Sequence, residues 1–233
     1  MYISIAANPS PFMTSVVRVL ALTAVVILLG CAHRAQGPSA GWLPNADGWR
    51  LRAVEDGPEP SWFAYDRDAP EAKVKEIRVV GRVDAEPSVT IQALRHRLLA
   101  EEFHPDGYEL EVLEDMGAQV VTKGVGALPW PFKDRVATER MRFSTDAETG
   151  VMRVDVDLLD DDVALPRGSM YVDLVRNTFV VAPMAGGGSV VTLDSVHDMG
   201  GAFPNGLIYA PVRKGMVGML DDVRALVASG EWR

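Results

Sequence analysis

The sequence is poor in the residues that crosslink a protein or bind a metal. Among its 233 residues there is a single cysteine, Cys31, so no disulfide can form within one chain. The four histidines, His33, His96, His104 and His197, are scattered and lack the spacing of metal ligands, which argues against a zinc site. We therefore expect a domain that is stabilised by its apolar core alone, without a metal or another cofactor.

Clusters of basic residues are missing as well. The chain has 23 Lys and Arg residues against 32 Asp and Glu residues, a net charge of −9. Arg18 is the only charged residue before Cys31, so 22 basic and 32 acidic residues remain from Cys31 onward, a net charge of −10. An acidic chain without a basic cluster is unsuited to nucleic acid and to electrostatic attachment to anionic lipid.

The apolar run at residues 19–29 is too short to span a membrane. It covers about eleven residues, fewer than the roughly twenty that a transmembrane helix needs. It follows Arg18 and ends in Leu28-Leu29-Gly30-Cys31. This order resembles a bacterial lipoprotein signal and implies cleavage before Cys31, acylation of that residue and a lipid anchor of several acyl chains. The alternative is a buried free cysteine at the end of a transmembrane helix.

The residues around this signal predict how the chain is divided. Met1 and Met13 are both candidate start residues, and Ala32, by resemblance to enteric lipoproteins, favours the outer membrane with the protein facing the periplasm. The polar stretch 33–40 contains Gly37-Pro38-Ser39 and predicts a flexible tether. We expect a signal peptide at 1–30, an acylated cysteine and tether at 31–41, and one domain at 42–229 that acts as a monomer.

The domain alternates between apolar and polar residues over most of its length. This period predicts strands at 49–54, 62–65, 74–83, 108–113, 119–125, 135–144, 151–159, 170–183 and 189–195. Helical spacing appears twice, from 86 to about 102 and from Pro204 or Leu207 to Ala228. Short connectors imply an antiparallel meander, so we predict an α+β fold in which a curved sheet covers the last helix.

Three segments carry a resemblance to a known family. Residues 128–135 read LPWPFKDR, residues 176–183 read RNTFVVAP, and residues 198–204 read DMGGAFP. In this order and spacing they resemble the motifs of the START (StAR-related lipid transfer) family, within the helix-grip superfamily. Phe179 stands where the family usually has Trp, and Met199 where it usually has Pro. The resemblance covers essentially all of residues 42–229.

The resemblance implies a U-shaped antiparallel sheet that grips the last helix around a tunnel for one lipid or sterol-like molecule, and no enzymatic activity. Flexible Met side chains suit such a tunnel, although a plain core position is the favoured interpretation for any single Met. The candidate cavity residues on the strands and the last helix are Lys123, Glu139, Met141, Phe143, Met216, Met219, Leu220 and Val223.

Two of these candidates are charged. Alternation places Glu139 on the same strand face as Met141 and Phe143, toward the expected cavity. Some START domains carry an acidic–basic pair on these two strands that meets the polar end of the ligand. Lys123 and Glu139 are the candidates for that pair with the signs exchanged; the alternative is that both are solvated charges at the rim.

Trp130 lies between two prolines in a connector between strands, and Phe132 follows the second of them. Because loops are usually polar, these aromatic residues suggest a lid over the tunnel or a membrane contact. The family resemblance places this loop at the tunnel mouth. The alternative is that both side chains fold back onto the core.

Motifs of common catalytic sites are absent from the sequence, including the Gly-x-Ser-x-Gly elbow, the Walker loop and His-Glu-x-x-His. His197 and Asp198 are adjacent on a predicted strand and point to opposite faces, which prevents an acid–base dyad. The leading hypothesis is a lipid-anchored lipid carrier. The alternatives are a helix-grip enzyme of cyclase or hydrolase type, and an envelope interaction module without a ligand.

Overall fold

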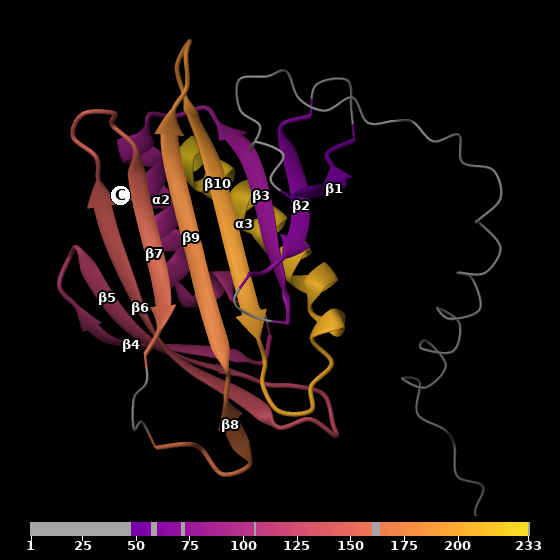
Figure 1. Ribbon diagram of the computed structural model, residues 1–233. Coiled ribbons are helices and arrows are strands. Elements are labelled where there is room, and N and C mark those ends of the chain that lie inside the picture. Colours follow the sequence, from indigo (N-terminus) through magenta and orange to yellow (C-terminus); the bar gives the residue numbers. More distant parts are fainter. Residues whose placement is uncertain (1–47, 57–59, 71–72, 105, 160–163, 233) are drawn as a thin grey trace, which may run out of the picture. The chain divides into compact units, whose positions relative to one another are not determined.

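The computed structural model describes residues 48–56, 60–70, 73–104, 106–159 and 164–232. These residues form one ten-stranded sheet, two α-helices and two short 3-10 helices (Figure 1). Among them, no helix has the length and apolar character needed to cross a membrane. Cys31 and the segments predicted to be a signal peptide and a tether lie outside the described residues.

The sheet is almost entirely antiparallel. Its strands are β1 (Arg50–Val54), β2 (Trp62–Asp68), β3 (Lys75–Val83), β4 (Tyr108–Asp115), β5 (Gln119–Gly126), β6 (Asp134–Thr145), β7 (Met152–Leu158), β8 (Ser169–Tyr171), β9 (Leu174–Pro183) and β10 (Ser189–Asp198). They are ordered β1-β2-β3-β10-β9-β7-β6-β5-β4, with β8 beside β6. β1, β2 and β3 are therefore connected to the rest of the sheet through β10, the last strand in the sequence.

The single strand predicted at 170–183 is wrong, because two strands occupy this stretch. β8 pairs in parallel with β6, whereas β9 pairs antiparallel with β7 and β10. The backbone changes partners between them: the Val172 amide donates to the Val136 carbonyl at 3.1 Å, and the Asp173 amide donates to the Asp198 carbonyl at 3.0 Å. Val172 and Val175, three residues apart, are buried in one cluster with Ala137, so the alternation of side chains shifts by one residue here. Because no glycine or proline marks this shift, the sequence pattern alone does not reveal it.

Both α-helices lie against one face of the sheet (Figure 1). α2 (Pro87–Leu99) starts with proline in its first turn, where the missing amide leaves no helical hydrogen bond unmade. α3 (Tyr209–Ser229) ends at Gly230, whose φ of 74° is favourable only for glycine at such a cap. The expected α+β architecture, a curved antiparallel sheet around a long C-terminal helix, is confirmed.

The core lies between this inner face and the helices. Ile77, Val79 and Val83 of β3 belong to it together with Leu220 and Val223 of α3. α3 approaches β3 so closely at Gly81 that a Cβ atom there would lie 2.1 Å from Leu220 Cδ2. The glycine therefore sets how near the helix can approach the sheet.

The outer face of the sheet carries ion pairs in place of a helix layer. Arg78 of β3 binds both carboxylate oxygens of Asp194 of β10 at 2.5 and 2.6 Å. The guanidinium groups of Arg67 and Arg78 lie 4.4 and 4.3 Å from the ring centre of Trp49. These cross-strand charges satisfy one another on a face that stays accessible to water.

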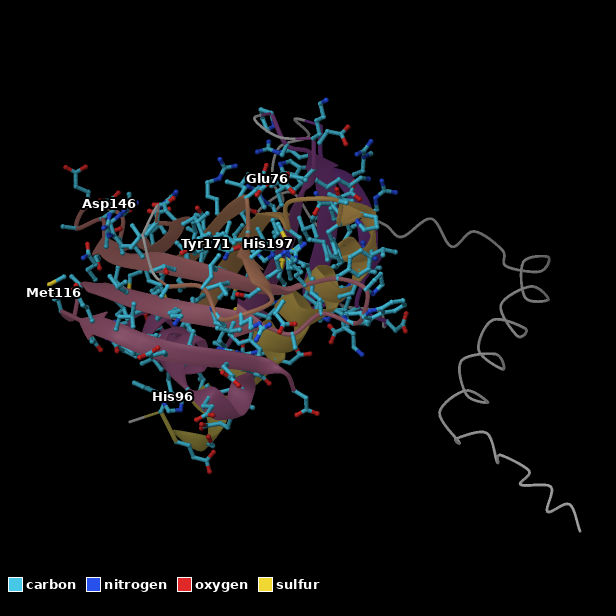
Figure 2. The ribbon with its side chains drawn as sticks, turned by 90° about the horizontal axis from the view of Figure 1, so that it is seen from below. Glu76, His96, Met116, Asp146, Tyr171 and His197 are labelled. Atoms are coloured by element: carbon cyan, nitrogen blue, oxygen red, sulfur yellow. The ribbon has the colours of Figure 1, made fainter. Side chains whose placement is uncertain are left out.

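Figure 2 marks one end of the sheet. Met116 in the β4–β5 turn and Asp146 in the β6–β7 turn lie on the same side of this view. The β5–β6 loop with Trp130, the end of β10 and the start of α3 belong to the opposite end of these antiparallel strands.

Candidate functional site

A cavity of about 300 Å³ lies between the inner face of the sheet and α3. Apolar side chains form most of its wall: Leu98, Phe103, Met141, Val156, Phe179, Val212, Met216 and Met219. The polar residues of the wall are Arg97, His104, Tyr108, Glu139, Asn177, Ser195 and His197. A mostly apolar pocket with a few polar groups is the usual form of a site for a hydrophobic small molecule.

Glu139 is the one carboxyl group among these lining residues. It stands in the middle of β6, opposite Thr122 of β5 and Leu158 of β7. The half-buried Glu139 side chain makes no hydrogen bond or ion pair with another residue that the structure describes. Burial raises the pKa of the Glu139 carboxyl from 4.5 to about 7, because a charged carboxylate is poorly solvated there.

His197 belongs to a small hydrogen-bonded group on β9 and β10. Its Nε2 lies 3.1 Å from Ser195 Oγ and 3.2 Å from Asn177 Oδ1. Burial lowers the pKa of this imidazole to about 4, so the ring is neutral at neutral pH. Since the Asn177 oxygen only accepts, Nε2 carries the hydrogen in this arrangement.

Two more ionisable side chains of the wall respond to the same environment. Burial raises the pKa of the Tyr108 phenol, and the negative charge of Glu139 adds to that rise. Burial lowers the pKa of His104, with a further contribution from the positive charge of Arg97. Each shift favours the neutral form, so the cavity suppresses charge on the groups that surround it.

The structure brings some of the candidate residues to this cavity and not others. Glu139, Met141, Met216 and Met219 line it. Leu220 and Val223 are buried in the core between α3 and the sheet. Phe143 lies further along β6, where the Arg95 guanidinium is 4.8 Å from the centre of its ring.

The structure does not bring Lys123 and Glu139 together. Lys123 stands opposite Thr138 in the β5–β6 register, and its neighbour Thr122 stands opposite Glu139. Because successive side chains of a strand leave opposite faces, Lys123 and Glu139 are on different sides of the sheet. The sequence does not fix the register between these two strands, so it did not show which residue of β5 stands opposite Glu139.

Trp130 and Phe132 have different surroundings. Trp130 is 92% exposed, whereas the Phe132 ring packs edge-on against Phe203 with 4.8 Å between ring centres. This contact joins the β5–β6 loop to the loop before α3. Leu207 on that second loop is 61% exposed, so two large apolar side chains reach solvent from neighbouring loops.

Arg135 reinforces the connection between these loops. It is 4% exposed, and its guanidinium donates to the backbone carbonyls of Met199 at 2.5 Å and Gly200 at 3.2 Å. A third bond reaches the Lys133 carbonyl at 2.5 Å. The start of β6 and the segment that leads into α3 are therefore held as one unit.

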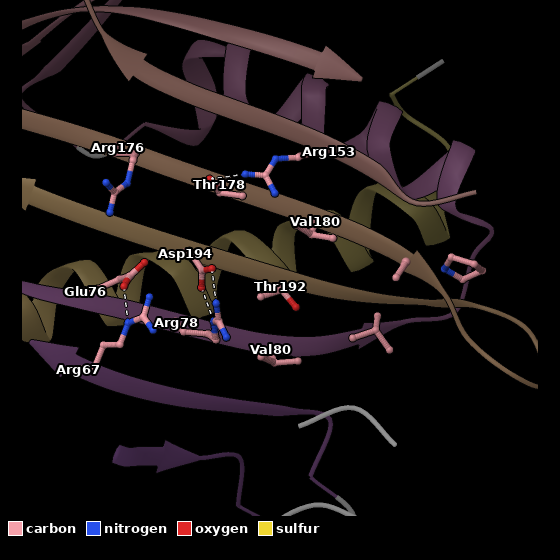
Figure 3. A pocket seen from close by; sticks show the side chains of 13 residues that line it. Arg67, Glu76, Arg78, Val80, Arg153, Arg176, Thr178, Val180, Thr192 and Asp194 are labelled. Carbon is pink, nitrogen blue, oxygen red and sulfur yellow. Dashed lines mark hydrogen bonds and ion pairs between the residues drawn. The ribbon is translucent and has the colours of Figure 1, made fainter. Parts of the chain in front are cut away.

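A larger depression of about 590 Å³ lies on the outer face of the sheet (Figure 3). Three arginines of its lining have acidic partners: Arg67 pairs with Glu76 at 2.5 Å, Arg78 with Asp194, and Arg153 with Asp155. Charged and polar side chains make up most of its lining, so it offers an apolar ligand fewer apolar contacts than the cavity under α3 does. The smaller cavity under α3 is the better candidate site.

The sequence pattern indicated Glu139 and three methionines but missed the histidine group. Asn177 and Ser195 are directly paired across β9 and β10, and His197 follows Ser195 by two residues on the same face. A scan for metal spacing does not detect such a group. The available signal was the strand alternation, which places Ser195 and His197 side by side.

Comparisons with known proteins support the fold. No protein-family model and no curated protein matches the sequence. A STAR-related lipid transfer protein from Xanthomonas axonopodis superposes with a TM-score of 0.64 at 22% identity, covering 78% of this chain and 99% of that one. Human StAR-related lipid transfer protein 5 gives 0.64 at 12% identity, covering 94% and 97%. The chain thus has the helix-grip fold of START domains.

Proposed function

We propose that this protein binds one hydrophobic molecule, a lipid or sterol-like compound, beneath α3 and carries or presents it at the cell envelope. The cavity carries this proposal: it is mostly apolar, and it has polar groups at only a few places. The shared fold with proteins named for lipid transfer adds support.

The cavity volume suggests a compact ligand. An engineered cavity of about 150 Å³ is known to hold benzene. The present cavity of about 300 Å³ has twice that volume, which suits a single chain or a small ring system. A sterol or a two-chain lipid requires α3 and the neighbouring loops to move outward, and the methionine side chains of α3 can adapt to that change.

The proposed gate consists of the Trp130 loop and the start of α3. Arg135 and the Phe132–Phe203 contact join these two segments, so both respond to a displacement of either one. Trp130 and Leu207 are available for insertion into a membrane. Contact with a bilayer would thereby be linked to access to the cavity.

Attachment at Cys31 is the envelope part of the proposal. Its support is the order of Arg18, the apolar run and Leu28-Leu29-Gly30-Cys31 in the sequence. Acylation of Cys31 would hold the domain, facing the periplasm, at one membrane.

Mass spectrometry of co-purified lipid tests the binding proposal. The full chain is isolated from bacterial membranes, extracted with solvent and compared with Gly215→Leu and Gly218→Leu. A Cβ atom meets nothing within 4 Å at either glycine, but only Gly215 lines the cavity. We expect Gly215→Leu to lose the bound molecule and Gly218→Leu to keep it. Equal, non-stoichiometric lipid in all three proteins would contradict the proposal.

The Ser195–His197 contact is the one observation that favours an enzyme. In a serine nucleophile, the neighbouring imidazole nitrogen must accept the hydroxyl proton. Here Nε2 faces the Asn177 oxygen as well and carries a hydrogen, which disfavours that role. Turnover of a hydrophobic ester by the purified protein, lost in Ser195→Ala, would support the enzyme instead.

A further inference from the structure

The cavity contains a carboxyl group and no available cation. Arg97 is the one Arg or Lys residue among the lining residues, and its Nε lies 2.6 Å from Asp222 Oδ2. Lys123, the candidate partner in the sequence, leaves the opposite face of the sheet. Within the described residues, Glu139 therefore lacks a positive partner.

Such a carboxyl group is costly in its charged form. Transfer of a carboxylate into an apolar site without a counterion is strongly unfavourable, and the group stays protonated to a higher pH instead. The raised pKa of Glu139 is consistent with that cost. A cation next to Glu139 would remove the cost of the unpaired charge and would form a charge-assisted hydrogen bond with the carboxylate.

The surroundings of Glu139 also suit a cation with an apolar body. The rings of Phe103, Tyr108 and Phe179 line the same cavity, and aromatic faces attract organic cations. Met141 and Met219 add polarizable thioethers beside them. An anionic ligand would find only an arginine that is already paired.

We propose that the preferred ligand is a hydrophobic amine, whose ammonium group supplies the positive charge that Glu139 lacks. This inference rests on the proposed lipid-binding function and specifies its ligand class. A neutral alcohol is the competing ligand, because it too can donate a hydrogen bond to Glu139. The two differ in charge, and charge is what the test varies.

The test compares three probes with the same chain: octylamine, 1-octanol and octanoate. Each is titrated calorimetrically at pH 8 into the full chain carrying Cys31→Ser. We expect octylamine to bind at least tenfold more tightly than octanol, and octanoate to bind most weakly, as follows from the strength of charge-assisted hydrogen bonds. In Glu139→Gln the preference for the amine should disappear while octanol binding is retained.

A second variant controls for the acidity of the whole chain. With a net charge of −9, the protein attracts any cation to its surface. Glu114→Gln removes one exposed carboxylate on β4 and should leave the amine preference unchanged. Octanol binding as tight as octylamine, or an amine preference that survives Glu139→Gln, would overturn the inference and leave the lipid-binding function standing. Failure of all three probes to bind would overturn both.

Discussion

Glu139 and His197 line one cavity, and burial shifts their pKa values in opposite directions. The pKa of the carboxyl rises to about 7, and that of the imidazole falls to about 4. Both groups are therefore mostly neutral between these values, around pH 6. An apolar ligand that enters under this condition displaces no ion from the wall.

The Glu139 shift predicts a pH-dependent loss of stability. In the unfolded chain the carboxyl ionises near pH 4.5, whereas in the folded protein it stays protonated to about pH 7. The unfolded state thus binds fewer protons in this window, so the free energy of unfolding falls as the pH rises through it. Glu139→Gln should be more stable than the parent by roughly 2–3 kcal/mol at pH 8 and by much less at pH 4.5.

Urea unfolding at the two pH values measures this difference. Glu148→Gln, at an exposed position in the β6–β7 turn, is the control and should follow the parent at both pH values. A constant difference between Glu139→Gln and the parent from pH 4.5 to 8 would show that the carboxyl is not desolvated.

For single residues, the sequence predicts the sheet face on which a side chain lies better than it predicts the residue that stands opposite on the next strand. Alternation alone brings Glu139 to the inner face with Met141, as the structure shows. It does not reveal that Thr122 and not Lys123 stands opposite Glu139, because register depends on how two strands meet. The site role of His197 was missed for a similar reason, because its contact with Asn177 depends on how β10 pairs with β9.

At the scale of elements, the packing of α3 on β3 controls the depth of the cavity. Gly81 leaves room for Leu220, and this contact keeps the helix near the sheet. Because Met216 precedes Leu220 by one turn on α3, a displacement of Leu220 also moves the cavity wall.

A double-mutant cycle tests this contact. Gly81→Ala should destabilise the protein by about 1–3 kcal/mol through overpacking. Leu220→Ala should cost about 2–5 kcal/mol through the space it leaves. In the double variant the new methyl group occupies part of that space, so we expect its cost in urea unfolding to be at least about 1 kcal/mol below the sum. Additive costs would argue against direct contact.

Trp130 predicts a membrane contact that does not depend on stability. Trp130→Ala should leave the melting temperature unchanged, because the side chain is 92% exposed. Its binding to zwitterionic vesicles should weaken at least tenfold, as follows from about 1.5–3 kcal/mol for burying a large apolar side chain. Sedimentation with vesicles measures the membrane binding of Trp130→Ala and of the parent protein.

The matched control is Met116→Ala in the β4–β5 turn. Met116 is 62% exposed and belongs to the other end of the sheet (Figure 2). If the two variants lose vesicle binding equally, the contact is non-specific and the Trp130 loop has no special role.

Most elements are predictable from the periods of the sequence, but their partners are not. The strand predicted at 74–83 is found at Lys75–Val83, and the helix predicted from 86 is found at Pro87–Leu99. The error at 170–183 arises where the chain stops pairing with β6 and starts pairing with β10, with no glycine or proline in between. Such a change of partner is decided by tertiary contacts.

For the whole molecule, the order of three short motifs was enough to indicate the fold. No family model matches, and the similar structures share 22% identity or 12% identity with this chain. The arrangement of a sheet gripping the last helix tolerates this divergence, since many apolar sequences can fill one core. The cavity volume and the lone carboxyl depend on individual side chains and need the structure.

The proposed anchor makes a prediction about the whole chain. Replacing Cys31 by Ser removes the acylation site. We expect the mature protein to carry acyl mass in intact mass spectrometry, and Cys31→Ser to lack it and to leave the outer-membrane fraction. Unmodified Cys31 in a membrane-bound protein would contradict the lipoprotein interpretation.

The pairing of β3 with β10 has a consequence for the order of events during synthesis of the chain. The two strands match residues 76–83 with 189–196, and Arg78 and Asp194 in this seam are 116 positions apart. Because the chain leaves the ribosome amino terminus first, β1–β3 emerge long before β10. These strands must wait, with one edge unpaired, until the last part of the chain emerges. A chain interrupted before residue 189 would leave them without a neighbour and open to proteases.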